Sequence, residues 1–386
     1  MRKMIAALLI LATVFTLIAI FPANEAEAKT DLPEIKWFVT GMTVEEACAT
    51  SPAILEIKRD GKALEETKTV ASGDTVVTAN GEYVAWVLGD VAEKGKADAY
   101  SYILIKRFCL KTYELNEQEL FCADINKDGN VNSYDYILEK RICLKTYTIP
   151  LPENSTGVPI LLYHHILTDA DKNTDQWRGN DITIATSEFR RHMKMLKDNG
   201  YNVATMDEVV AYVRGEILLP KKSLVLCFDD GYKSNTYYAA PILREFGFKA
   251  TVFSIMSFFD GRYQDWYDVP SLQHITRKDL ASFSDVLDQQ CHTWANHNQL
   301  SQQSYNQVYN DLMQSQSCEK YKYFAYPYGD YNDTVIKAVK AAGFLAAVTT
   351  EARNAVPGDK VYEIPRYTVT SPMADSDYME LIGKAG

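Results

Sequence analysis

The chain has 386 residues, enough for two or three domains, and 47% apolar with 24% charged residues is typical of a globular protein. Its net charge of −11 argues against nucleic acid or an anionic membrane surface as a partner. The cysteine count is seven, an odd number, so the sequence predicts no disulfide framework, although a bridge between Cys109 and Cys143 stays open.

The N-terminus has the pattern of a targeting signal. A basic start precedes an apolar run from Met4 to Phe21, and the small residues Ala26 and Ala28 follow. We expect a signal peptide over residues 1–28, with an uncleaved membrane anchor as the alternative. Either way, the rest of the protein is expected to be secreted or attached to a cell surface, with no other membrane contact.

Residues 29–87 predict a small β-rich module. Short runs alternate apolar and polar residues, and "RDGK" (59–62) and "ANGE" (79–82) carry the Asp-Gly and Asn-Gly pairs of tight hairpin turns. No residue in this stretch indicates a catalytic or metal-binding role.

An internal repeat follows. "RFCLKTY" starts at 107 and recurs as "RICLKTY" at 141, which sets a repeat of 34 residues. In the second copy, "DINKDGNVNSYD" (124–135) places oxygen-bearing residues at the loop positions that bind Ca²⁺ and a glycine at the sharp turn. The predicted calcium ligands are Asp124, Asn126, Asp128, the carbonyl of Asn130, Asn132 and Asp135.

The first copy of this loop, "DVAEKGKADAYS" (90–101), departs from the pattern. Ala92 and Lys94 replace ligands, and Ser101 ends the loop, so we expect one calcium site rather than two. A tandem loop that ends in Asp resembles the dockerin family over residues 88–148. That resemblance implies a small helical module and a cohesin-type scaffold protein as partner.

Residues 149–157 predict a linker, because they hold two prolines and small polar residues without periodicity. Residues 158–386 predict one α/β domain. Apolar runs such as "SLVLCF" alternate with amphipathic stretches, and such runs suit parallel strands that are covered on both faces.

The strongest chemical signal is "SLVLCFDDGY", an apolar strand that ends in Asp229 and Asp230. Asp-Asp-Gly alone is a turn signal. However, catalytic groups of α/β barrels lie where strands end, and paired carboxylates can divide their work. One binds a metal while the other acts as a general base.

Six motifs in order resemble the polysaccharide deacetylase (NodB-homology) family over about residues 158–370. They are "ILLYHHI", "LCFDDGY", "KATVFSI", "CHTWANHNQL", "FAYPYGDYN" and "YEIPRYTV". The resemblance implies a distorted (β/α) barrel, a polysaccharide substrate and metal-dependent removal of acetyl groups.

By this resemblance Asp229 is the catalytic base, and Asp230 and His292 bind the metal. The second metal histidine corresponds to Asn296 by spacing alone, but to His297 by the downstream His-x-x-Leu register. One inserted residue would explain His297, with Asn296 as the alternative ligand. An Asp-His-His set suits Zn²⁺, and Co²⁺, Ni²⁺ and Fe²⁺ stay open.

Further roles follow from the same resemblance. The backbone N–H of Tyr328 is the expected oxyanion donor. Many members have an arginine where this chain has Ala325, so Arg366 is expected to orient Asp229, with a surface cation as the alternative. No histidine follows His297, so His164 is the preferred general acid. Its neighbour His165 and a purely structural role for His164 stay open.

The predicted function is a hydrolase that removes N-acetyl groups from an N-acetylglucosamine-containing glycan. An O-acetyl esterase acting on xylan is the alternative that the dockerin resemblance favours. A sugar-binding protein without catalysis is the second alternative, because of the unusual histidine spacing and the replaced arginine.

Overall fold

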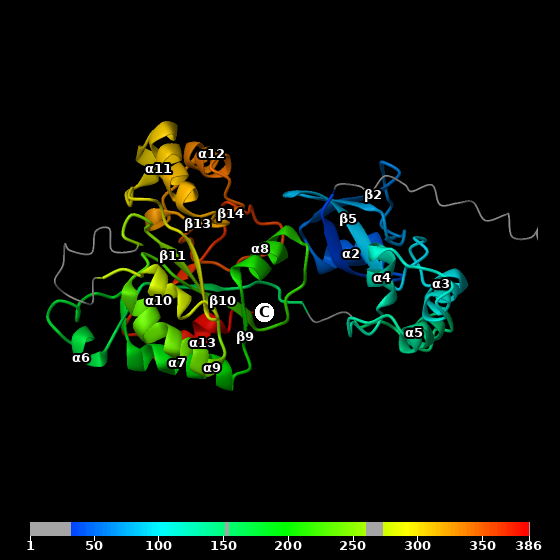
Figure 1. Cartoon of the computed structure of the whole chain (residues 1–386), viewed down its shortest axis with the longest axis horizontal. Coiled ribbons are helices and arrows are strands. Elements are labelled where there is room, and N and C mark those ends of the chain that lie inside the picture. Colours follow the sequence, from blue (N-terminus) through cyan, green and yellow to red (C-terminus); the bar gives the residue numbers. More distant parts are fainter. Residues whose placement is uncertain (1–31, 151–153, 260–272, 386) are drawn as a thin grey trace, which may run out of the picture. The chain divides into compact units, whose positions relative to one another are not determined.

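The structure is a computed structural model that describes residues 32–150, 154–259 and 273–385 (Figure 1). The chain divides into two units, Met1–Pro33 and Glu34–Gly386, and the predicted signal peptide lies outside the described residues. Within the described ranges no helix has the length and apolar character needed to cross a membrane. All seven cysteines are free, so Cys109 and Cys143 are not bonded to each other.

The segment after the predicted signal peptide forms a five-stranded sheet in the order β1-β5-β4-β2-β3. Its strands are β1 (Glu34–Val39), β2 (Ile54–Arg59), β3 (Lys62–Ala63), β4 (Thr75–Thr78) and β5 (Gly81–Leu88), and α2 (Val44–Thr50) follows β1. Both hairpins predicted from Asp-Gly and Asn-Gly are present, joining β2 to β3 and β4 to β5. Asp60 and Gly61 both have positive φ, as a tight hairpin turn requires.

The repeat contains three helices, α3 (Ala99–Cys109), α4 (Glu117–Ala123) and α5 (Ser133–Cys143). Helices α3 and α5 start at the ends of the two repeated loops and pack on each other. Asp98 caps α3, and Asn132 caps α5 in the same way, so the two copies share one local design.

Glu139 on α5 is a buried acid within this helix pair. It is fully buried, and within the described residues neither carboxylate oxygen has a hydrogen-bond partner. Burial, with smaller contributions from Asp90 and Asp98, raises the pKa of Glu139 to about 8. The folded state therefore holds a proton that the unfolded chain releases near pH 4.5.

This shift gives a pH dependence of stability with a definite sign. Between about pH 4.5 and 8 the native state binds more protons, so the free energy of unfolding falls as pH rises. We expect Glu139→Gln to raise the melting temperature at pH 8–9 and to change it little at pH 4. Calorimetry of the whole chain tests this, with the exposed Glu114→Gln as control. Equal pH slopes for wild type and Glu139→Gln would contradict it.

The second half of the predicted linker contacts residues that are distant in sequence. Asn154 forms a β-bridge with Pro220, and the N–H of Ser155 donates to the Leu219 carbonyl at 2.7 Å. The Tyr212 hydroxyl donates to the Ser155 carbonyl. These partners are distant in sequence, so composition alone suggested a linker over all of residues 149–157.

The α/β domain is built on a curled sheet of parallel strands in the order β14-β13-β12-β11-β10-β6-β15, with β9 beside β10. The strands are β6 (Ile160–Tyr163), β9 (Asn202–Ala204), β10 (Ser223–Phe228), β11 (Ala250–Ser254), β12 (Leu287–Cys291), β13 (Tyr323–Ala325), β14 (Ala346–Val348) and β15 (Tyr367–Thr368). Every residue of β6, β10, β11, β13 and β14 is buried, as their apolar sequences predict for a parallel sheet.

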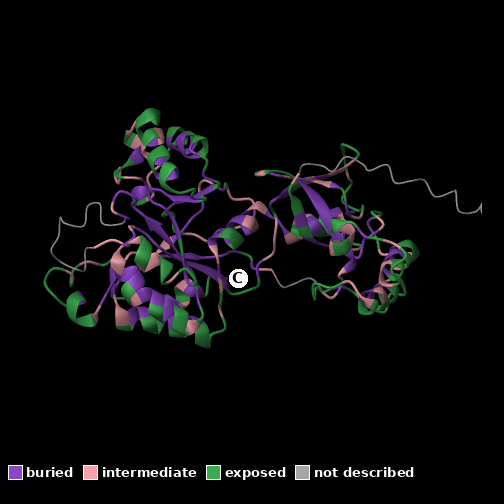
Figure 2. Cartoon of the chain, in the orientation of Figure 1, coloured by how far each residue is buried: buried purple, intermediate pink, exposed green. Residues whose placement is uncertain are grey.

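Helices cover this sheet and expose their outer faces (Figure 2). The main ones are α7 (Thr186–Asp198), α8 (Met206–Arg214), α9 (Ala240–Phe246), α11 (Tyr305–Cys318), α12 (Asp333–Ala341) and α13 (Asp375–Ile382). Shorter elements are α6 (Asp169–Lys172), α10 (Arg277–Ala281), a π-helix at Asn235–Ala239, and the pair β7 (His165–Leu167) and β8 (Thr183–Ala185).

Residues 364–368 join the two ends of the curled sheet. Ile364 bridges Val348 of β14, and Tyr367 pairs with Leu161 of β6. Arg366 lies between these contacts and is fully buried. The curled sheet thus carries a buried guanidinium at its centre, which excludes the interpretation of Arg366 as a surface cation.

Candidate metal and catalytic site

The paired aspartates lie at the carboxyl end of β10. The N–H of Asp229 donates to the Tyr163 carbonyl at 3.0 Å, which continues the sheet pairing up to the first carboxylate. Asp230 and Gly231 then turn the chain through the left-handed region, with φ of 71° and 72°. A Cβ on Gly231 would stand 2.5 Å from the Ser254 hydroxyl, so this position requires glycine.

His292 follows β12 directly and is buried. Its Nδ1 donates to the Ala325 carbonyl at 2.7 Å, which places the proton on Nδ1 and leaves Nε2 free to bind a metal. Many relatives were expected to have an arginine side chain at this position. In this chain, Ala325 orients His292 through its backbone carbonyl.

His297 reaches the site through an irregular loop. Thr293 has φ of 77°, and residues 292–299 contain bends rather than helical turns. The carboxylate of Asp311 on α11 accepts the N–H groups of Trp294, Ala295 and Asn296 at 2.7–3.0 Å. This clamp holds the loop, and sequence reasoning missed it because Asp311 is one acid in an otherwise ordinary helical stretch.

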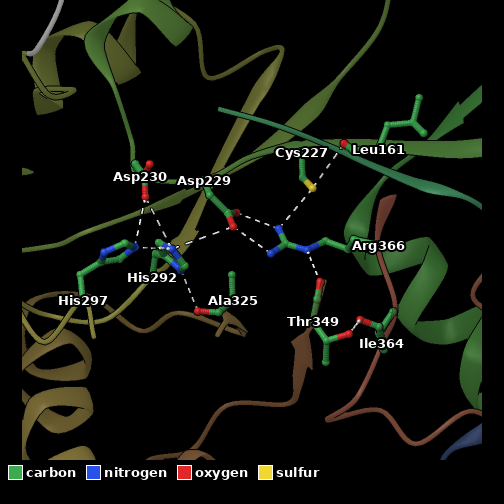
Figure 3. A network of polar contacts seen from close by, with 10 residues as sticks. All are labelled: Leu161, Cys227, Asp229, Asp230, His292, His297, Ala325, Thr349, Ile364 and Arg366. Atoms are coloured by element: carbon green, nitrogen blue, oxygen red, sulfur yellow. Dashed lines mark hydrogen bonds and ion pairs between the residues drawn. The ribbon is translucent and has the colours of Figure 1, made fainter. Parts of the chain in front are cut away.

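Three ligand atoms meet at this point. His292 Nε2 lies 3.1 Å from His297 Nε2 and 3.6 Å from Asp230 Oδ1, and His297 Nε2 lies 3.3 Å from Asp230 Oδ1 (Figure 3). Ligand atoms at about 2.0–2.2 Å from a tetrahedral ion stand roughly 3.3–3.6 Å apart. Within the described ranges this is the one cluster of three such residues with ligand atoms within 4.8 Å of one another.

Asn296 is engaged elsewhere. Its side-chain oxygen accepts from Gln303 Nε2 at 2.8 Å and from Asn298 Nδ2 at 3.1 Å, and its amide nitrogen donates back to Gln303. The geometry therefore favours His297 over Asn296 as the third ligand.

The protonation states suit cation binding. Burial alone would raise the pKa of Asp230, but the hydrogen bond from His297 and the charges of nearby histidines lower it far below its usual value. Burial lowers the pKa of His292 despite the two adjacent carboxylates. An ionised carboxylate and a neutral imidazole are the forms that coordinate a metal.

Asp229 forms a two-pronged ion pair with Arg366 beside the ligand cluster (Figure 3). The two terminal guanidinium nitrogens donate to the two carboxylate oxygens at 2.7 and 2.8 Å, and Arg366 Nε donates to the Thr349 carbonyl at 2.8 Å. Burial favours the neutral acid, but Arg366 and then His292 outweigh it and hold the pKa of Asp229 below its usual value. Asp229 is therefore an ionised carboxylate of fixed orientation, 3.9 Å from His292 Nε2.

Two more histidines lie near the carboxylates. His164, at the end of β6, is close enough for its charge to lower the pKa of both Asp229 and Asp230, whereas His165 bonds Ser234 at 2.8 Å and stacks on Tyr232. The two adjacent histidines therefore have different surroundings in the structure. His274, which sequence reasoning did not single out, packs against Tyr232 and Phe258, and burial lowers its pKa to about 4 against the opposing charge of Asp230.

Tyr328 borders the cluster on the side of β13. Its backbone is left-handed at φ 58°, its ring centre lies 5.0 Å from that of His297, and its side chain is 65% exposed. Gly329 follows, where a Cβ would stand 2.0 Å from the Thr350 hydroxyl. This turn therefore presents the Tyr328 ring to the ligand cluster.

Comparison with protein families assigns the class. Residues 218–347 match the family model "Polysaccharide deacetylase", a stretch that includes Asp229, Asp230, His292 and His297. The chain therefore contains a polysaccharide deacetylase domain and is a hydrolase of the carbohydrate deacetylase class. This assignment favours an enzyme over a sugar-binding protein without catalysis.

Individual relatives agree with this class. The polysaccharide-deacetylase-like protein YxkH of Bacillus subtilis (strain 168) is 27% identical over 233 residues, 58% of this chain and 76% of that protein. A poly-beta-1,6-N-acetyl-D-glucosamine N-deacetylase of Staphylococcus aureus (strain MRSA252) is 27% identical over 208 residues, 49% of this chain and 69% of that protein.

Solved structures show the same fold. Deacetylase PplD of Streptococcus pyogenes superposes with a TM-score of 0.51 at 23% identity, covering 59% of this chain and 99% of PplD. IcaB of Ammonifex degensii gives 0.50 at 22% identity, covering 61% and 99%. The curled parallel sheet is therefore the deacetylase fold.

Proposed function

We propose that this chain is a secreted or cell-surface, metal-dependent deacetylase that hydrolyses N-acetyl groups of an N-acetylglucosamine-containing glycan. The observation that carries the proposal is the cluster of Asp230, His292 and His297 beside the ionised Asp229–Arg366 pair. The signal peptide over residues 1–28 belongs to this proposal as its route out of the cell.

The ligand cluster fits a divalent transition metal. Two imidazole nitrogens and one carboxylate oxygen at 3.1–3.6 Å separations match a tetrahedral ion with one position left for water or substrate. Zn²⁺ is the first choice, and Co²⁺, Ni²⁺ or Fe²⁺ would accept the same donors. Such an ion, when bound, polarises the acetyl carbonyl and makes water a stronger acid.

The protein groups around it then have separate tasks. Asp229 accepts a proton from the attacking water, and Arg366 keeps it ionised and oriented for this. The backbone N–H of Tyr328 donates to the oxyanion of the tetrahedral intermediate. His164 donates a proton to the departing amine, which an amide substrate needs more than an ester does.

The N-acetyl substrate rests on the resemblance to the Staphylococcus aureus N-deacetylase. The test is acetate release by the metal-loaded whole chain from N-acetylglucosamine oligomers and, in parallel, from acetylated xylan. We expect release from the oligomers, loss with a chelator and recovery with Zn²⁺. Release from xylan alone would make the chain an O-acetyl esterase, and release unaffected by chelation would reject the metal-dependent mechanism.

The loop at 124–135 is proposed to hold one Ca²⁺. Both oxygens of Asp124 accept backbone N–H groups, from Asp128 and Gly129, so the loop already curls around this first ligand position. In the first copy, Asp90 accepts the equivalent bonds from Lys94 and Gly95, but the Lys94 ammonium lies 3.5 Å from Asp98. An ammonium group thus lies beside Asp98 in the first loop, where the second copy carries the carboxylate of Asp128.

Calcium titration of the whole chain is expected to give one site. Asp128→Ala should abolish it, whereas Lys94→Ala, at the same loop position of the first copy, should keep one. Isothermal calorimetry after removal of other metals measures both stoichiometries. Two sites in the wild type, or a retained site in Asp128→Ala, would contradict the one-site proposal.

Docking to a cohesin-type scaffold protein is supported by a repeated apolar surface. Large hydrophobic side chains are exposed in pairs, each pair at the same position of the two copies: Tyr100 with Tyr134, Ile103 with Ile137, and Leu110 with Leu144. Exposed apolar groups in such a pattern are typical of a protein–protein interface.

A further inference from the structure

A groove lined by amide side chains lies beside the metal ligands. It has a volume of about 720 Å³, within the range of small-ligand sites. It is lined by Tyr328 and by the amide side chains of Asn296, Asn298, Gln299, Gln302, Gln303 and Gln307. No charged side chain lines it among the described residues, although the chain carries a net charge of −11.

Tyr328 connects the groove to the metal-ligand cluster. The exposed tyrosine ring lines the groove and stands 5.0 Å from the ring of His297, so the groove and the ligand cluster share this residue as a border. An exposed aromatic face packs against the apolar face of a sugar ring. A chain of sugars that leaves the metal centre on this side therefore enters the groove.

The groove walls are held in place from outside the groove. Ser301 donates from its N–H and hydroxyl to Asp330 at 2.7 and 2.9 Å, and Leu300 is buried. Asp311 clamps the loop at its other end. Anchoring of this kind fixes the backbone of the walls, so a bound ligand needs to order only their amide side chains.

The chemistry of the walls selects the ligand. A primary amide both donates and accepts hydrogen bonds, which matches the hydroxyl and acetamido groups of a neutral sugar. It offers no ion-pair partner, so an ammonium group or a carboxylate gains no charge pairing in a groove lined by neutral side chains.

We infer that this groove binds the sugars next to the one being deacetylated and that it prefers neutral, N-acetylated sugars to cationic, deacetylated ones. The inference rests on the proposed function for the identity of the glycan. Such a preference makes the enzyme most effective on a fully acetylated stretch of glycan. The deacetylated product is bound less tightly.

The test is calorimetric binding of a five-sugar N-acetylglucosamine oligomer to the whole chain carrying Asp229→Asn, which slows turnover. Adding Gln299→Ala with Gln302→Ala should weaken binding roughly 10-fold or more, since each lost hydrogen bond contributes about 1 kcal/mol. Gln314→Ala, an exposed amide on α11 outside the groove, should leave the Kd unchanged. The fully deacetylated oligomer should bind more weakly than the acetylated one.

An unchanged Kd in the double glutamine variant, or no measurable binding of the acetylated oligomer, would overturn the glycan site. Equal or tighter binding of the deacetylated oligomer would overturn the preference for neutral sugars. Because these readouts need no turnover, they are separate from the proposed function, which fails when the metal-loaded wild type releases no acetate.

Discussion

Asp229→Asn is expected to lower kcat on an N-acetylglucosamine oligomer by about 10³-fold, the size of a general-base contribution. Asparagine has nearly the same shape and still accepts a hydrogen bond from Arg366, but it cannot take a proton from water. Asp230, His292 and His297 are untouched, so the metal content of the purified protein should not change. Steady-state acetate release with metal analysis measures both quantities.

Asp198→Asn is the matched control, an exposed aspartate on α7, and it should retain full activity. A melting temperature close to that of wild type shows that Asp229→Asn remains folded. If Asp229→Asn kept more than a tenth of the wild-type kcat, the assignment of Asp229 as the base would be wrong.

Arg366→Met is expected to destabilise the deacetylase domain by about 3–5 kcal/mol, because it leaves the buried Asp229 carboxylate without its partner. It should also raise the pKa of Asp229, since burial is then opposed only by the histidines. A base must be ionised to work, so the acidic limb of the kcat/KM profile should move to higher pH. Denaturant unfolding and the pH profile are the two measurements.

The matched control is Arg244→Met. Arg244 also grips a carboxylate, Asp285, with two nitrogens, but both side chains are about half exposed. Its loss should cost no more than about 1 kcal/mol. Equal losses of stability in the two variants would mean that burial of the Asp229–Arg366 pair has no energetic consequence.

The parts of the site that sequence reasoning located are those with a local signature. Asp229 and Asp230 end an apolar run, and His292 follows another strand, so strand periodicity and motif order were enough to place them. Arg366 is predicted from its motif, but its burial between β14 and β6 depends on how residues 364–368 join the sheet ends.

The parts that sequence reasoning missed depend on contacts between distant residues. His297 was predicted from its downstream register, but the role of Asp311 was not: this residue of the next helix holds the irregular loop that leads to His297. Likewise, Asn154 and Ser155 pair with Pro220 and Leu219, and Glu139 is fully buried. None of these contacts can be recognised from the hydrophobic periodicity or the composition of the sequence.

The most direct test of this account is the number of transition-metal ions per chain in three proteins after loading with Zn²⁺ and desalting. Mass spectrometry of the metals is expected to give one ion for the wild type and one for Asn296→Ala, but almost none for His297→Ala. A full complement of metal in His297→Ala, or none in the wild type, would show that Asp230, His292 and His297 do not form the metal site.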